Sequence, residues 1–181
     1  MLPKNIGLVS SKKSAAYKDV LRTIGERFKV RLHVADVLTQ GVHASKDIIN
    51  GIKRLNNVGV NLILVVRGGG SIEDLAAYND EGVARAIRAS KVPVITGIGH
   101  DTDVTIADLA ADKSEATPTG AAKKAVPDKQ ELVKNLGHLK DRLDKSYSNN
   151  MNKRKIVIYK AVIVGIFVLI ILFLIYKYVI G

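Results

Sequence analysis

A histidine and two carboxylates lie close together in the segment Gly97-Ile98-Gly99-His100-Asp101-Thr102-Asp103. A histidine beside a carboxylate can act as a general acid or base, because the carboxylate fixes the tautomer of the ring and stabilises its charged form. Binding of a metal ion through His100, Asp101 and Asp103 is a second use of the same residues. A histidine that only caps a helix is a third interpretation, and the segment alone does not decide between the three.

A second candidate is the run Arg67-Gly68-Gly69-Gly70-Ser71. Glycines let the backbone approach a ligand closely and adopt positive φ, and a helix starting there would offer free N–H groups to an anion. Arg67 adds a planar fork of donors that suits phosphate oxygens. Ser71 and Asp74 also fit a helix N-cap, so a tight turn with a capped helix is the alternative. We expect Arg67 and the loop Gly68, Gly69, Gly70 and Ser71 to bind phosphate, without the Walker or dinucleotide pattern.

The elements that must position these residues follow an α/β rhythm, in which short apolar runs alternate with amphipathic segments. Strands are expected at residues 5–10, 30–38, 61–66 and 93–97, and helices at 14–28, 44–55, 71–89 and 105–111. This order predicts a three-layer helix–sheet–helix domain with a mainly parallel sheet. Ligands of such sheets bind beyond the carboxyl ends of the strands, where both candidate segments fall. Asp19 lies early in the first helix, after the polar segment 10–14, so it could face the same edge.

Composition changes after this region. Thr117-Pro118-Thr119-Gly120 and Pro127 break the regular pattern, so the compact domain is expected to span residues 1–126. Residues 127–155 are expected to form a basic connector, with a charged helix at 128–147 and a polar hinge at 146–152. Four leucines in that helix are spaced four, three and four residues apart, which is too short a seam to establish a coiled coil.

The C-terminal segment predicts a transmembrane helix at residues 156–180, whose 25 residues span roughly 37 Å as a helix. Lys153-Arg154-Lys155 precedes it and only Lys177 follows, which predicts a single-pass membrane protein with its N-terminal domain in the cytoplasm. A buried core helix is the alternative. The net charge of +11 is concentrated near this segment, since residues 1–112 hold 15 basic and 12 acidic residues, whereas 113–155 hold 11 and 5. The charge therefore favours contact with a lipid surface over a DNA-binding patch.

Together the segments resemble the catalytic domain of the exodeoxyribonuclease VII large subunit. The similarity covers about 120 residues and is carried by residues 2–10, 15–21, 40–41, 66–75, 78–81, 83–87, 92–95, 99–108 and 116–119. The resemblance implies hydrolysis of single-stranded DNA from either end to short 5′-phosphorylated products. It marks Asp19, Arg67, His100 and Asp103 as catalytic. It requires no cofactor, and Mg²⁺ is compatible with it.

The sequence also departs from that family. The family's large subunit has an OB-fold before this domain and a long helical region that recruits a small subunit, and we expect a chain without either. Lys12-Lys13-Ser14 stands where the family has Pro-Thr-Gly. The expected partners are single-stranded DNA and a lipid membrane, a homo-oligomer is compatible with the sequence, and the small subunit is left open. The alternatives are a non-catalytic module that binds nucleic acid or nucleotides at the membrane, and a phosphoester hydrolase of small nucleotides.

Overall fold

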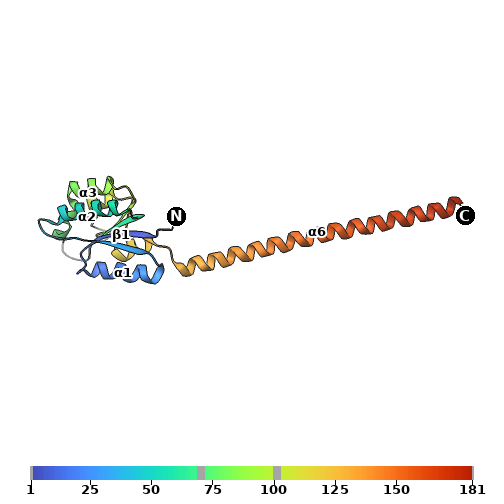
Figure 1. Ribbon diagram of the computed structural model, residues 1–181, viewed down its shortest axis with the longest axis horizontal. Coiled ribbons are helices and arrows are strands. Elements are labelled where there is room, and N and C mark those ends of the chain that lie inside the picture. Colours follow the sequence, from blue (N-terminus) through green and yellow to red (C-terminus); the bar gives the residue numbers. More distant parts are fainter. Residues whose placement is uncertain (1, 69–71, 100–102, 181) are drawn as a thin grey trace. The chain divides into compact units, whose positions relative to one another are not determined.

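The computed structural model describes residues 2–68, 72–99 and 103–180, and it describes the side chains of these residues except for 72–74 and 172–180 (Figure 1). The chain divides into two compact units, Met1–Leu132 and Val133–Gly181, which are considered separately.

The first unit is built on a parallel sheet with the strand order β2-β1-β3-β4-β5. Its strands are β1 (Asn5–Ser10), β2 (Arg31–Asp36), β3 (Leu62–Val66), β4 (Val94–Gly97) and β5 (Lys113–Ser114). The predicted parallel sheet is confirmed, with β5 as a short additional edge strand. The chain runs outward from β1 to β2 and then returns to β3 on the other side of β1. The carboxyl ends of β1 and β3 therefore flank the point where the winding direction changes, which is where ligands bind in such sheets.

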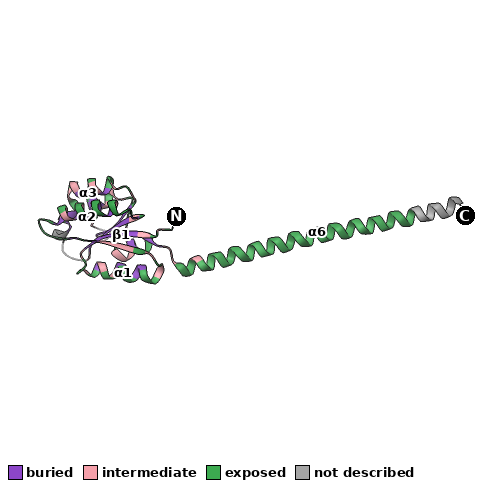
Figure 2. Cartoon of the chain, viewed as in Figure 1, coloured by how far each residue is buried: buried purple, intermediate pink, exposed green. Residues whose placement is uncertain are grey.

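Helices cover both faces of the sheet (Figure 1). One face carries α1 (Ala15–Arg27) and α5 (Pro118–Ala125). The other carries α2 (Ala44–Val58), the 3-10 helix η1 (Ile72–Asn79), α3 (Glu81–Arg88) and α4 (Ile106–Ala110). Side chains of β3 point alternately to the two faces of the sheet. Leu64 packs with residues of α1 and α5, whereas Val65 packs with residues of α2 on the opposite face. Figure 2 shows the strands buried between these layers, as the three-layer prediction required.

Helix α5 corrects the interpretation of Thr117-Pro118 in the sequence. Thr117-Pro118 was expected to break the pattern, but these residues begin a helix. The Thr117 hydroxyl accepts a hydrogen bond from the Gly120 amide at 3.0 Å, and Pro118 occupies the first helical position, where its missing N–H has no intrahelical partner to lose. Ala121 and Ala122 are fully buried against the sheet and α1.

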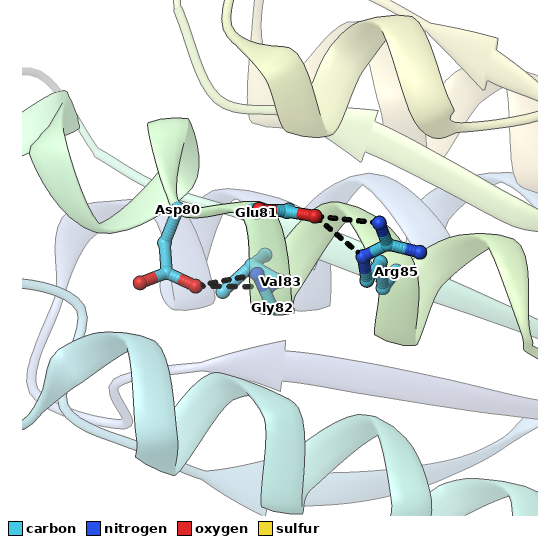
Figure 3. A network of polar contacts seen from close by, with 5 residues as sticks. All are labelled: Asp80, Glu81, Gly82, Val83 and Arg85. Carbon is cyan, nitrogen blue, oxygen red and sulfur yellow. Dashed lines mark hydrogen bonds and ion pairs between the residues drawn. The ribbon is translucent and has the colours of Figure 1, made fainter.

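The predicted helix at 71–89 is divided in two. The 3-10 helix η1 ends at Asn79, and α3 starts anew because Asp80 caps it (Figure 3). The Asp80 carboxylate accepts hydrogen bonds from the amides of Gly82 at 2.7 Å and Val83 at 3.2 Å. The alternative cap that the sequence suggested at Ser71 lies outside the described residues.

Replacing Asp80 with alanine is expected to lower the free energy of unfolding by about 1 kcal/mol, because two amides at the start of α3 lose their acceptor. Glu81→Gln is the matched control. Its ion pair with Arg85 is exposed, with a distance of 2.6 Å, and should contribute less than about 0.5 kcal/mol. Urea denaturation of the two variants gives both values, and equal losses would contradict the assigned role of Asp80.

The second unit consists of the continuation of α6 (Lys129–Ile180). The helix is continuous through residues 146–152, which were expected to form a hinge, so polar side chains there do not interrupt the helical backbone. Its large apolar side chains are exposed as far as Ile171. Figure 2 colours nearly all of this helix as exposed wherever its burial is described. Within the part of the chain that the structure describes, no helix is long and apolar enough to cross a membrane. The side chains of residues 172–180, which belong to the span predicted at 156–180, are not described.

Candidate functional site

The loop after β1 brings α1 to the carboxyl edge of the sheet. The Ser14 hydroxyl donates a hydrogen bond to the Ser11 carbonyl at 2.7 Å and accepts one from the Tyr17 amide at 3.1 Å, which caps α1. The Lys12 amide donates to the Asp36 carboxylate at 2.9 Å, which ties the loop to the end of β2. Asp19 lies in the second turn of the helix that starts here. It forms an ion pair with Arg22 at 3.0 Å, and 41% of its side-chain surface is exposed.

Arg67 leaves the end of β3 and is buried, with only 7% of its surface exposed. Its amide donates a hydrogen bond to the Gly97 carbonyl at 3.2 Å, which joins the ends of β3 and β4. Tyr78 of η1 is fully buried, and burial raises the pKa of its phenol while the positive charge of Arg67 opposes that rise. Tyr78 therefore stays neutral at physiological pH and does not itself neutralise the guanidinium.

Asp19 and Arg67 line one cavity of about 390 Å³ at the carboxyl edge of the sheet. The remaining lining comes from Ile98, Gly99, Ala116, Thr117, Pro118 and Thr119. The structure thus brings together two of the four residues marked as catalytic. Asp19 of α1 and Arg67 after β3 are 48 positions apart in the sequence. The structure also adds the start of α5, which the sequence analysis did not assign to the site. The pair Thr117-Pro118 could have revealed this helix start, because threonine is a common N-cap residue and proline is common at the first helical position.

Asp103 lines a neighbouring cavity of about 220 Å³, and Gly99 and Ala116 line both cavities. Asp103 is therefore placed next to the Asp19–Arg67 cavity rather than inside it. Asn79 of η1 contacts the start of α4, which follows Asp103 in the chain. Its side-chain oxygen accepts a hydrogen bond from the Ile106 amide at 2.9 Å.

Other predicted site residues lie outside the described residues. These are Gly69, Gly70, Ser71, His100 and Asp101. Among the residues that are described, no group of three or more histidine or carboxylate side chains is placed to hold a metal ion. Asp108 shares the cavity of Asp103, but its Oδ2 accepts hydrogen bonds from the Thr105 amide at 3.0 Å and the Thr105 hydroxyl at 2.7 Å. Asp108 thus forms a capping box with Thr105, the N-cap residue of α4.

Gly68 is the described member of the glycine run, and its φ is not positive. A Cβ added there would meet Ala16 at 3.7 Å, an ordinary van der Waals distance. Gly68 is therefore not required by the conformation or packing of the protein itself. Its predicted role in binding phosphate stays a prediction.

Gly68→Ala is expected to change the free energy of unfolding by less than about 1 kcal/mol. We expect it to raise KM for a phosphodiester substrate, because the new methyl group would separate the ligand from the backbone. Thermal unfolding and steady-state kinetics on the same preparation test this. An unchanged KM would remove Gly68 from the phosphate-binding loop.

The arrangement suits an anionic phosphoester. The guanidinium of the buried Arg67 can bind and stabilise phosphate oxygens, and the partly exposed carboxylate of Asp19, which lines the same cavity, can orient a water molecule.

Comparison with known proteins identifies the family of the chain. The profile of the family described as "Exonuclease VII, large subunit" matches residues 1–161. The chain is 45% identical over 153 residues to a protein of Clostridium tetani named exodeoxyribonuclease 7 large subunit, covering 83% of this chain and 39% of that protein. Similarly named proteins are 46% identical over 150 residues in Halothermothrix orenii and 43% identical over 155 residues in Carboxydothermus hydrogenoformans. These matches cover 82% and 84% of this chain, and 37% and 33% of the two relatives. The chain thus spans between a third and two-fifths of the length of these relatives, and over that span it belongs to the exonuclease VII large subunit family.

Proposed function

We propose that this domain is an exonuclease that hydrolyses phosphodiester bonds of single-stranded DNA to short 5′-phosphorylated products. The observation that carries the proposal is the shared cavity of Asp19 and Arg67 at the carboxyl edge of the sheet. It occurs in a chain whose relatives are named exodeoxyribonuclease 7 large subunits. The preference for single-stranded DNA rests on that kinship.

In the proposed reaction a water oxygen attacks the phosphorus atom and the bond to the 3′ oxygen breaks, which leaves a 5′-phosphate and a 3′-hydroxyl. Arg67 and the amides of the glycine run bind the phosphate and stabilise the negative charge added in the transition state. His100, oriented by Asp103, transfers the proton needed by the leaving 3′ oxygen. Asp19 orients the attacking water.

We propose that no cofactor is obligatory. Mg²⁺ would act, where present, by neutralising phosphate charge next to Asp19. Parallel reactions with Mg²⁺ and with EDTA decide this point, because a strict metal requirement would abolish cleavage in EDTA.

The full chain, solubilised in detergent, should be incubated with end-labelled single-stranded and double-stranded DNA beside the His100→Ala variant. Cleavage restricted to single strands and lost in the variant would support the proposal. Equal activity of the variant would remove His100 from the mechanism. Binding of single strands by folded protein without cleavage would instead favour a non-catalytic nucleic-acid-binding module.

We also propose that residues 156–180 anchor the protein in a membrane. The sequence has no charged residue from Ala161 to Tyr176, and the apolar side chains of α6 are exposed from Ile156 to Ile171. The excess of basic residues before the segment favours a cytoplasmic first unit. Co-flotation with vesicles that resists alkaline carbonate would support insertion, whereas release by salt would indicate only electrostatic contact with the lipid surface.

A further inference from the structure

We propose that a DNA strand bound at the candidate site continues along a groove between α1 and α5, where Lys123 contacts its backbone phosphate. This inference rests on the proposed function, since it concerns the substrate of the same site. It adds a strand path that neither the sequence motifs nor the four catalytic positions define.

The groove is a cavity of about 510 Å³ that adjoins the Asp19–Arg67 cavity through Thr119, which lines both. Helix α1 contributes Asp19 to the site and, in its next turns, Arg22 and Arg27 to the groove. Helix α5 contributes Thr119 and, one turn further on, Lys123. The two helices pack together through buried side chains, so the groove has a fixed base.

Charge identifies the ligand that this groove suits. Arg27 is paired with Asp128 at 3.2 Å, and Arg22 with Asp19 at 3.0 Å. Among the described residues, Lys123 forms no ion pair with a carboxylate, so its ammonium can bind an anion. Exposed pairs such as Arg22–Asp19 contribute little, so Arg22 can also turn towards a phosphate. The carboxylates of Glu26 and Asp128 also line the groove, so it is not uniformly favourable to a phosphate.

Helix geometry sets the reach of the path. Four residues separate Thr119 from Lys123, which corresponds to about 6 Å along α5. One strand of DNA advances about 3.4 Å per nucleotide when stacked, and more when stretched. Lys123 should therefore contact the phosphate one or two nucleotides from the scissile bond.

Lys124 provides a matched control on the same helix. Its side chain contacts that of Lys113 of β5, and this contact lowers the pKa of Lys113. Lys124 does not line the groove. Removing its charge changes the net charge of the protein by the same amount as removing that of Lys123.

The test compares wild type, Lys123→Gln and Lys124→Gln in the full chain, using oligo-dT of two to twelve nucleotides and thymidine 5′-(p-nitrophenyl phosphate). In Lys123→Gln, the ratio of kcat/KM for the dodecamer to that for the small ester should fall about threefold to fivefold. The salt dependence of dodecamer binding, plotted as log K against log salt, should lose about 0.7 from its slope. Lys124→Gln should leave both quantities as in wild type. Equal effects of the two variants, or none, would overturn the strand path.

Fluorescence anisotropy with labelled dT12 separates this inference from the proposed function. If wild type binds the oligonucleotide but cleaves nothing, the nuclease proposal fails, and selective weakening of binding by Lys123→Gln would still support the path. If wild type binds no oligonucleotide, the path is overturned as well.

Discussion

Replacing Arg67 with alanine is expected to lower kcat/KM for single-stranded DNA by a factor of about 10² to 10³. Arg67 is a buried residue that lines the same cavity as Asp19, so its positive charge lies beside the expected position of the phosphate. It would therefore stabilise the charge that accumulates on the phosphate oxygens as the bond to the 3′ oxygen breaks. Steady-state cleavage of an end-labelled oligonucleotide measures the loss.

Arg67→Lys separates the contribution of charge from that of geometry. Lysine keeps one positive charge but loses the fork of donors that can bind two phosphate oxygens together, so most of the activity should still be lost. Because Arg67 is buried, circular dichroism and thermal unfolding must show that both variants are folded. An Arg67→Ala variant that is folded and retains more than about a tenth of wild-type kcat/KM would exclude Arg67 from transition-state stabilisation.

The sequence predicted the main strands and the edge of the sheet at which the site would lie. A strand such as β3 is buried on both sides, so its sequence is a continuous run of apolar residues. Such a run makes the strand easy to identify from the sequence. The order of strands and helices then places the segments after β1, β3 and β4 at the same edge. That reasoning is sufficient to bring Asp19 and Arg67 together, as the cavity confirms.

What could not be predicted depends on packing between distant segments. Tyr78 could not be assigned to the surroundings of Arg67, because its burial arises from the fold and not from its neighbours in sequence. The two-residue strand β5 is too short to produce an alternating pattern. Helix α5 was missed because a proline was interpreted as a break, although proline after a capping threonine is compatible with a helix start.

Gly99→Ala is the second substitution expected to have a large effect. A Cβ at Gly99 would collide with the backbone carbonyl of Asp103, and a backbone atom cannot move aside as a flexible side chain can. The segment that carries Asp103 must then shift. Gly99 and Ala116 form the boundary between the Asp19–Arg67 cavity and the cavity of Asp103, so the shift changes both. Because a displacement of about 1 Å can reduce the rate of a positioned reaction about 100-fold, we expect kcat to fall by about 10- to 100-fold.

Gly25→Ala is the matched control, because a Cβ at this helical glycine of α1 meets no atom within 4 Å. It should leave kcat unchanged and stabilise the helix by about 0.5–1 kcal/mol. If Gly99→Ala lowers kcat while its thermal unfolding remains cooperative, the close approach of Gly99 to Asp103 is needed for catalytic geometry. If the Gly99 variant instead keeps wild-type kcat, the segment can shift without consequence, and Asp103 would lose its proposed role in orienting His100.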